Sequence, residues 1–338
     1  MAGTSDTAGA APAVSVIMPA YNVARYIGEA LESVFAQTFR DFEVIVVNDG
    51  SPDTPELERA LAPYRERVRY IVQENGGVSA ARNTAIRAAR APLVAHLDPD
   101  DLWEPEYLAA QLAEFERDPS TDVLYPDALI FGDAPEAGRR YMEWCPSSGE
   151  VTVESLLEER CHVMCAVTAR RDALLRAGLF DEGLRCSEDF ELWLRVLKSG
   201  GRIRYQRRVL ARYRRHAASH TADAARLGVA VLRMLDKAEG SLELTPAELA
   251  ALRAMRERVR AGASLEEGKA ALARGDVDAA LAGLKAAGAH KKSLKLSLIM
   301  LALRLAPWLL RAAYAARERL ASRPRAKLQD GGARAPRH

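Results

Sequence analysis

Short apolar runs alternate with helical segments over residues 14–135, and this alternation limits the chain to a small set of folds. The apolar runs are typical of buried strands, and they lie at Val14–Met18, Glu43–Val47, Val68–Val72 and Leu93–Leu97. Helical segments follow at Ala24–Gln37, from Pro55, at Val78–Arg90 and at Pro105–Arg117, and Asn22 is placed to cap the first of them. The repeat predicts an α/β fold with a mainly parallel sheet and helices on both faces.

The rest of the chain is less regular and then becomes wholly helical. Residues 120–215 predict two short strands in TDVLYPDALIF, a helix near Val153–Glu159, a strand near Val163–Ala169, a helix over Glu188–Lys198 and late strands in RIRYQ and VLARY. From about Thr221 the composition predicts a helical extension, in which GKAALARGDVDAALAGLKAAG has the spacing and Gly-Asp turn of a tetratricopeptide-type helical pair. We expect disorder over residues 1–12, an α/β domain at 13–220, the extension at 221–322 and a disordered tail at 323–338.

Composition excludes several classes of protein. The formal net charge of +2 predicts no nucleic-acid partner. The N-terminus lacks the pattern of a signal peptide, and no apolar run is long enough for an ordinary membrane span. Four cysteines in such a chain indicate free thiols in a reducing cytoplasm. Cys161, His162 and Cys165 have a loose spacing for zinc, and alternation along a strand would scatter them, so a structural role is favoured.

The last predicted helix has an apolar face and a basic face. Leu298, Leu305 and Leu309 fall on one side, Arg304, Arg311 and Arg317 fall on another, and Trp308 lies between them in the sequence. This pattern suits a helix lying at a membrane surface, so residues 292–320 are a candidate for peripheral contact with the inner face of the cell membrane. The alternatives are packing on its own domain or on the second subunit of a homodimer. Pro307 should kink or break the helix.

Three carboxylates lie close together in the segment HLDPDDLW, at Asp98, Asp100 and Asp101. They follow the strand that ends at Leu97, and the carboxyl ends of parallel strands are where α/β folds hold ligands. Like charges this close repel one another unless a cation lies among them. The segment therefore predicts a divalent metal site.

Four loops should meet at this edge of the sheet, at Pro19–Asn22, Asn48–Pro55, Gln73–Gly77 and Asp98–Trp103. They bring Tyr21, Asp49, Asn75 and Arg82 towards the acidic segment. This set offers an aromatic face, hydrogen-bonding carboxylates, a guanidinium and a metal cage. A nucleoside diphosphate needs these features for its base, its ribose and its pyrophosphate.

The strings VSVIMPAYN, VVNDGSPDTP, QENGGVSAARNTA, HLDPDDLWEPEYL and SEDFELWLR occur in the order seen in family 2 glycosyltransferases of the GT-A fold. Over residues 14–216 the chain resembles that family. The resemblance implies that the nucleotide-sugar is bound by Pro19, Tyr21, Asp49, Asn75, Arg82, Asp98 and Asp100. Tyr21 would pack near the base and Asp49 would bond to it. Asp98 and Asp100 match the D-x-D motif, which Asp101 extends.

The resemblance also implies a metal and a catalytic base. Mg²⁺ or Mn²⁺ would be held by Asp100, Asp101 and His216, and which aspartate binds it directly stays open. Asp189 matches the base, and the adjacent Glu188 can raise its pKa, which suits a group that must accept a proton.

Together these features predict a metal-dependent, inverting glycosyltransferase that uses a nucleotide-sugar, most simply a UDP-sugar. The acceptor would be a saccharide or a lipid-linked compound, as in polysaccharide, O-antigen or glycolipid assembly. The arginines of Arg202–Arg215 could face an anionic acceptor or simply form a solvated surface. The alternative is a non-catalytic nucleotide-sugar-binding protein whose helical tail recruits partners. A nucleotidyltransferase or a dinucleotide-binding oxidoreductase is disfavoured, because no Gly-rich phosphate loop follows a predicted strand.

Overall fold

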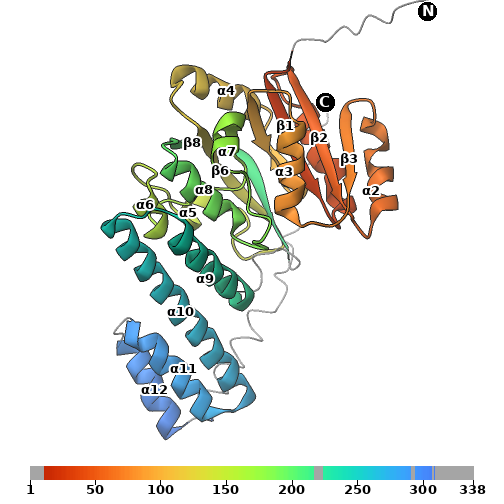
Figure 1. Cartoon of the computed structure of the whole chain (residues 1–338). Coiled ribbons are helices and arrows are strands. Elements are labelled where there is room, and N and C mark those ends of the chain that lie inside the picture. The colour runs from red at the N-terminus through yellow and green to blue at the C-terminus, as the bar shows by residue number, and fades with distance from the viewer. Residues whose placement is uncertain (1–10, 217–223, 291–293, 307, 309–338) are drawn as a thin grey trace, which may run out of the picture. The chain divides into compact units, whose positions relative to one another are not determined.

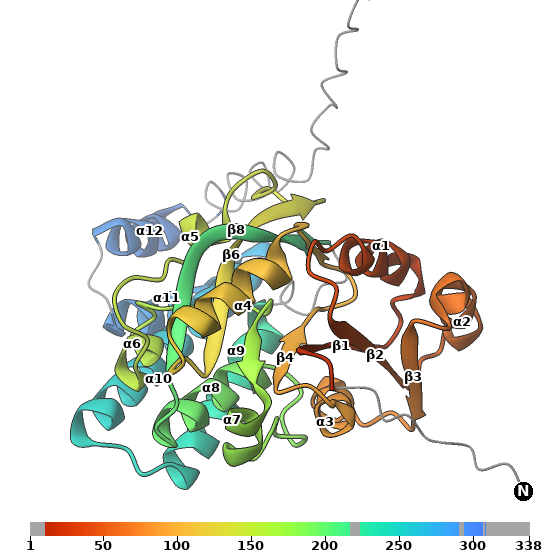
Figure 2. The same cartoon turned by 90° about the horizontal axis from the view of Figure 1, so that it is seen from above.

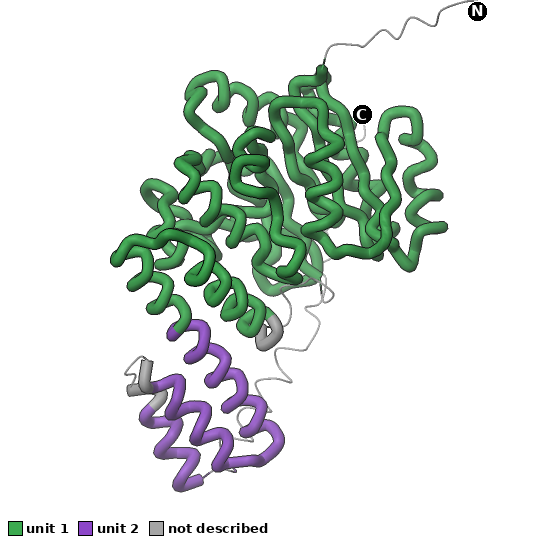
Figure 3. The backbone as a smooth tube through the Cα atoms, viewed as in Figure 1, with its two compact units in different colours: residues 1–256 green, residues 257–338 purple. Residues whose placement is uncertain are grey.

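The structure is a computed structural model that describes residues 11–216, 224–290, 294–306 and 308. The chain divides into two compact units, residues 1–256 and 257–338, and the division falls inside helix α10, Pro246–Arg274 (Figure 3). The predicted disordered ends and the predicted domain boundary at residue 220 fall mainly outside the described residues. The assignment of residues 13–220 and 221–322 to separate domains therefore stays a prediction.

The larger unit is built on one sheet, whose strand order is β3-β2-β1-β4-β7-β6-β8-β5 (Figure 1). The four strands from the first half of the chain are parallel, since β1 pairs with β2 and β4, and β2 pairs with β3. Their bounds are β1 Val14–Ala20, β2 Phe42–Asp49, β3 Val68–Gln73 and β4 Leu93–His96. This pairing confirms the predicted parallel sheet. The apolar runs of β1, β2 and β4 form its buried centre, as expected for parallel strands covered on both faces.

The second half of the sheet differs from the sequence-based expectation. The strands are β5 Leu102–Trp103, β6 Val123–Gly132, β7 Thr168–Arg170 and β8 Ile203–Arg215. The two short strands expected in TDVLYPDALIF form the single strand β6, and RIRYQ and VLARY form the single strand β8. Each is continuous because the two pair in parallel along their length, with the pairing irregularity at Asp127 taken up as a bulge. The strand expected near Val163–Ala169 shrinks to β7, which is antiparallel to β4 and β6.

Helices cover both faces of the sheet. Figure 2 shows α1 and α2 over one face of β1–β3 and α3 under the other. The bounds are α1 Ala24–Phe35, α2 Thr54–Leu61, α3 Val78–Ala88, α4 Tyr107–Arg117, α5 Tyr141–Trp144, α6 Val153–Leu157, α7 Arg171–Arg176, α8 Glu188–Lys198 and α9 Ala224–Ser241. Helix α1 buries Ile27, Leu31 and Val34, which recur at helical spacing on one face.

The predicted cap of α1 is wrong. Asn22 has a φ of 56°, and α1 begins after Val23 without a side-chain cap. Asp53, from the loop after β2, instead accepts a hydrogen bond from the backbone N–H of Ala24 at 2.9 Å. A carboxylate from a neighbouring loop thus satisfies a backbone donor of the first turn and favours its partial positive charge.

The smaller unit contains the tight helical pair that the sequence predicts. Helix α10 ends at Arg274, Gly275 adopts a φ of 87°, and the Asp276 carboxylate accepts from the backbone N–H of Ala279 at the start of α11, Val277–His290. A Cβ on Gly283 would lie 2.8 Å from the Cα of Gly268, so α10 and α11 touch backbone to backbone. Leucines and alanines of α10, α11 and α12, Leu294–Leu305, form the core around this contact.

Helix α12 leaves large apolar side chains exposed. Leu298, Leu301 and Leu305 are exposed to solvent, as is Trp308 beyond the helix. Several residues of the predicted two-faced helix lie outside the described residues, namely Pro307, Leu309, Arg311 and Arg317. Helix α12 ends at Leu305, two residues before Pro307. Among the described helices, none combines the length and the hydropathy needed to cross a membrane.

Candidate active site

The loops after β2 and β3 are tied together by Asp49 at the end of β2. This carboxylate is buried and accepts hydrogen bonds from the side chain of Gln73 at 2.7 Å and from the backbone N–H groups of Gly76 at 2.9 Å and Gly77 at 2.7 Å. Gly77 adopts a φ of 90°, which only glycine accepts readily. The exposed Asn75 donates to the backbone carbonyl of Asp49 at 2.9 Å. Asp49 and Asn75 therefore lie together, as predicted from the sheet topology.

The loop after β1 is joined to the same cluster. The backbone N–H of Asn22 donates to the hydroxyl of Ser51 at 2.6 Å, which fixes the end of β1 against the loop after β2. Tyr21 precedes this contact and is 52% exposed, so its ring is open to a ligand. Pro19 is buried near the carboxyl end of β1.

Arg82, on α3, lies buried between two carboxylates. One guanidinium nitrogen donates to Asp98 at 2.8 Å and the other donates to Glu188 at 2.7 Å. Burial alone would lower the pKa of Arg82, but the charges of Asp98 and Glu188 raise it above its ordinary value. Arg82 is therefore a permanent cation that joins the acidic segment to the start of α8.

The three aspartates of the acidic segment have different partners. Asp98 bonds to Arg82, and Asp100 lies 3.2 Å from Nε2 of His216, whose ring stacks on Tyr26. Burial and the charge of Asp98 raise the pKa of Asp100, while the hydrogen bond from His216 partly offsets this. His216 and Asp100, both predicted metal ligands, thus lie in direct contact.

Asp101 is the most buried of the three. Its carboxylate accepts the backbone N–H of Arg214 at 2.7 Å and the thiol of Cys165 at 3.6 Å. Burial and the charges of Asp100 and Asp98 raise the pKa of Asp101 well above its ordinary value. The raised pKa means that the negative charge of the Asp101 carboxylate is poorly stabilised by its surroundings. A bound cation would stabilise this charge.

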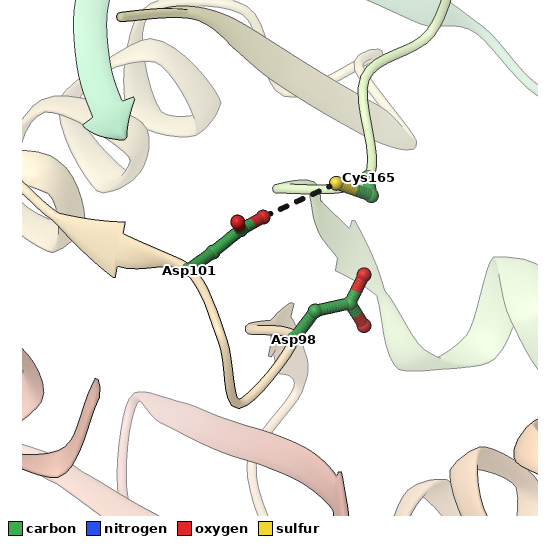
Figure 4. Close-up of side chains that lie close together, drawn as sticks. All are labelled: Asp98, Asp101 and Cys165. Carbon is green, nitrogen blue, oxygen red and sulfur yellow. Dashed lines mark hydrogen bonds between the residues drawn. The ribbon is translucent and has the colours of Figure 1, made fainter. Parts of the chain in front are cut away.

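Asp98, Asp101 and Cys165 could hold a metal ion together (Figure 4). One ligand atom from each lies within 4.8 Å of the other two. Carboxylate oxygens suit Mg²⁺ and Mn²⁺, so Asp98 and Asp101 fit the predicted metal. Cys165 does not, because burial raises the pKa of its thiol well above the ordinary value and these ions prefer oxygen ligands. This group contains Asp101 of the predicted ligands and adds two residues, whereas Asp100 and His216 lie outside it.

Sequence reasoning did not connect Cys165 with the acidic segment. The weighed zinc pattern grouped it with Cys161 and His162, but Cys161 donates to the carbonyl of Ser148 and His162 contacts the carbonyl of Pro146. Only the antiparallel pairing of β7 with β4 brings Cys165 to Asp101, and that pairing has no local signal in the sequence.

Asp189 lies at the first turn of α8, beside the Arg82 bridge. Its Oδ1 accepts the backbone N–H of Phe190 at 2.7 Å. Burial and the neighbouring charge of Glu188 raise the pKa of Asp189 to about 6, and Arg82 offsets part of the rise. Glu191 instead pairs with Arg195 at 2.6 Å, away from this carboxylate. Asp189 therefore has the proton affinity of a group that can act as a base near neutral pH.

Comparison with known proteins agrees with this geometry. The model of "Glycosyl transferase family 2" matches residues 15–176, and an uncharacterized glycosyltransferase of Rickettsia prowazekii is 30% identical over 220 residues, or 63% of this chain and 67% of that protein. The chain belongs to glycosyltransferase family 2. It spans only about a third of the length of other curated relatives, with matches covering 35% and 34% of two of them.

Solved structures share the family's fold at low identity. TarS 1–349 of S. aureus, solved with UDP-GlcNAc, has a TM-score of 0.60 and 21% identity over 91% of this chain and 92% of that one. The mannosyltransferase PcManGT of Pyrobaculum calidifontis, solved with GDP-Man and Mn²⁺, has a TM-score of 0.60 and 22% identity over 92% and 87%. The fold of this chain is accordingly of the GT-A type.

Replacing Arg82 with methionine should destabilise the protein strongly. The substitution keeps most of the side-chain volume but removes the cation that pairs with the buried Glu188 and the partly exposed Asp98. We expect the free energy of unfolding, measured with urea, to fall by about 3–5 kcal/mol. Arg87→Met on the same helix is the control. Arg87 is 59% exposed, and its ion pair with Glu182 is long, at 3.9 Å, so its loss should cost little. Equal losses in the two variants would contradict the role given to Arg82.

Proposed function

We propose that this chain is an inverting, metal-dependent glycosyltransferase that moves a sugar from a nucleotide-sugar, a UDP-sugar, to an acceptor hydroxyl. The observation that carries the proposal is the hydrogen-bonded connection of Glu188, Arg82 and Asp98, which puts the carboxylate of Asp189 next to the acidic segment. The nucleotide-sugars bound by TarS and PcManGT support this class of donor. A protein that only bound the donor would have little use for a partly buried carboxylate with a raised pKa.

The donor would lie along the carboxyl edge of β1–β4. Tyr21 offers its exposed ring to the base, and Asp49 would accept a hydrogen bond from it. Three donors already hold Asp49, which makes this carboxylate a rigid acceptor. The other residues proposed to contact the donor are Pro19, Asn75, Arg82, Asp98 and Asp100.

Mg²⁺ or Mn²⁺ would be held by carboxylate oxygens of Asp98 and Asp101, with Asp100 and His216 beside them. When bound, the metal supplies positive charge that neutralises the leaving diphosphate. Arg82 adds a fixed guanidinium to the same region, at no cost of reorganisation during the reaction.

Asp189 would act as the base. Its Oδ1 is occupied by the N–H of Phe190, so Oδ2 takes the proton of the acceptor hydroxyl. The acceptor oxygen forms a bond to the anomeric carbon from the face opposite the leaving group. The bond from that carbon to the diphosphate breaks, and its electron pair leaves with the nucleotide. The transition state resembles an oxocarbenium ion, and the configuration at the anomeric carbon is inverted.

We further propose that the acceptor is a saccharide or a lipid-linked compound, and that the chain works at the inner face of the cell membrane. The support is the exposed apolar row of α12, with Leu298, Leu301 and Leu305, followed by the exposed Trp308. Apolar side chains of this kind beside basic residues suit contact with a lipid surface.

Asp189→Asn should lower kcat by about 10²–10⁴-fold, because the amide cannot accept the acceptor's proton. The affinity for the donor, measured by calorimetry, should change little, since the substitution keeps size and hydrogen-bonding shape. Asp172→Asn is the matched control, as Asp172 is an exposed acid in the first turn of α7. Full turnover by the Asp189 variant would remove this residue from the mechanism.

The rate should depend on pH through the same carboxylate. A base must be deprotonated to act, and the pKa of Asp189 is raised to about 6, so activity should be full above this value and decline as the pH falls through it. The profile of kcat/KM against pH reports this ionisation in the free enzyme. A decline centred near the ordinary carboxyl value of about 4 would contradict the assignment.

Donor binding should require a divalent metal. In a panel of nucleotide-sugars, a UDP-sugar with Mn²⁺ should raise the melting temperature, since a ligand at 100 times its Kd contributes about 2.7 kcal/mol. EDTA should abolish the rise, and Asp100→Ala and Asp101→Ala should reduce it. A donor that stabilises the protein equally with and without EDTA would rule out the metal. Donor binding without transfer to any acceptor would favour the non-catalytic alternative.

A further inference from the structure

Three aromatic side chains and one arginine lie together on α5 and at the end of β8. We refer to these residues, Tyr141, Trp144, Tyr213 and Arg215, as the aromatic platform. The rings of Tyr141 and Trp144 meet edge to face with centroids 6.0 Å apart, and those of Tyr141 and Tyr213 do so at 5.6 Å. The guanidinium carbon of Arg215 lies 4.8 Å from the centroid of Trp144. Trp144 remains 39% exposed, so its large ring is held in place but still open to a ligand.

The platform is positioned by a buried charge. Asp127, in the bulge of β6, has a side chain with no exposed surface, and its carboxylate accepts from Arg140 at 2.6 Å and from the backbone N–H of Met142 at 3.1 Å. These contacts fix the first turn of α5, a helix of only four residues that could not hold its own position. Asp127 therefore anchors the start of α5 and holds the geometry of the platform.

The platform lies beside the groups proposed to carry the reaction. Arg214, between Tyr213 and Arg215, donates its backbone N–H to Asp101 and its side chain to the carbonyl of Asp100. Tyr213, whose ring meets that of Tyr141 with centroids 5.6 Å apart, is the residue before Arg214 in β8. The platform therefore adjoins the stretch of backbone that bonds to Asp101.

We propose that the aromatic platform is the acceptor subsite and that it binds a pyranose ring of a saccharide acceptor. This inference rests on the proposed function and goes beyond it by choosing among acceptors. The flat C–H face of a pyranose packs well on an exposed indole, while its hydroxyls can bond to polar groups at the rim, here Arg215 and the tyrosine hydroxyls. A polyprenyl chain would require a longer apolar groove than these rings offer.

The test compares acceptors and variants. Methyl glycosides of glucose, galactose, N-acetylglucosamine and rhamnose are compared with glycerol phosphate and farnesyl phosphate as acceptors, with the donor found in the thermal panel. At least one pyranoside should accept the sugar. Trp144→Ala should raise its KM at least ~10-fold and Trp144→Phe should restore most of the loss, since stacking needs a ring. Leu175→Ala is the matched control, because Leu175, on α7, is also 39% exposed and lies outside the platform.

Binding is measured separately from turnover, by saturation-transfer NMR of the same pyranosides with the UDP-loaded protein. Loss of the signal in Trp144→Ala, but not in Leu175→Ala, supports the subsite even if transfer fails. A failure of transfer alone would count against the proposed function. The inference is overturned if the wild type binds no pyranoside of the panel, if transfer goes only to glycerol phosphate or farnesyl phosphate, or if Trp144→Ala leaves the KM for the pyranoside unchanged.

Discussion

The buried guanidinium of Arg82 is the interaction on which the rest of the site depends. It joins α3 to Asp98, which is 16 residues away in the chain, and to Glu188, which is 106 residues away. The arginine could not be buried without these two carboxylates, and the buried Glu188 could not stay charged without the arginine. One side chain therefore holds the acidic segment against the start of α8, where Asp189, proposed as the base, follows Glu188.

The acidic segment shows what burial and partners do to residues that look equivalent in the sequence. Asp98 is neutralised by Arg82, Asp100 is held by His216, and Asp101 is buried against the backbone of Arg214. Repulsion within the segment is therefore unevenly relieved. Asp101 is the aspartate whose negative charge is least compensated, so a cation would bind most favourably at that end of the segment.

Sequence reasoning predicted the parts of this structure that depend on local pattern. The strands β1–β4 and the helices between them follow from periodicity, and the meeting of Asp49 with Asn75 follows from parallel strands sharing one edge. It could not predict contacts created by pairing between distant strands. Cys165 and Arg214 reach Asp101 across 64 and 113 residues, through β7 and β8, and nothing near either residue marks its partner. The clustered carboxylates alone predict a metal site, whereas Asp189 as the base follows from the family resemblance, and all of these roles remain predictions.

Strand β8 carries side chains to two separate places. Neighbouring residues in a strand point to opposite faces, so Arg214 reaches Glu29 and the carbonyl of Asp100, while Tyr213 and Arg215 join the aromatic platform. Inserting or deleting a single residue near this end would exchange the two sets of side chains. Insertions or deletions here should therefore be tolerated only when they involve two residues. Related enzymes that use other acceptors should differ by substitutions at Tyr213 and Arg215, with Arg214 retained.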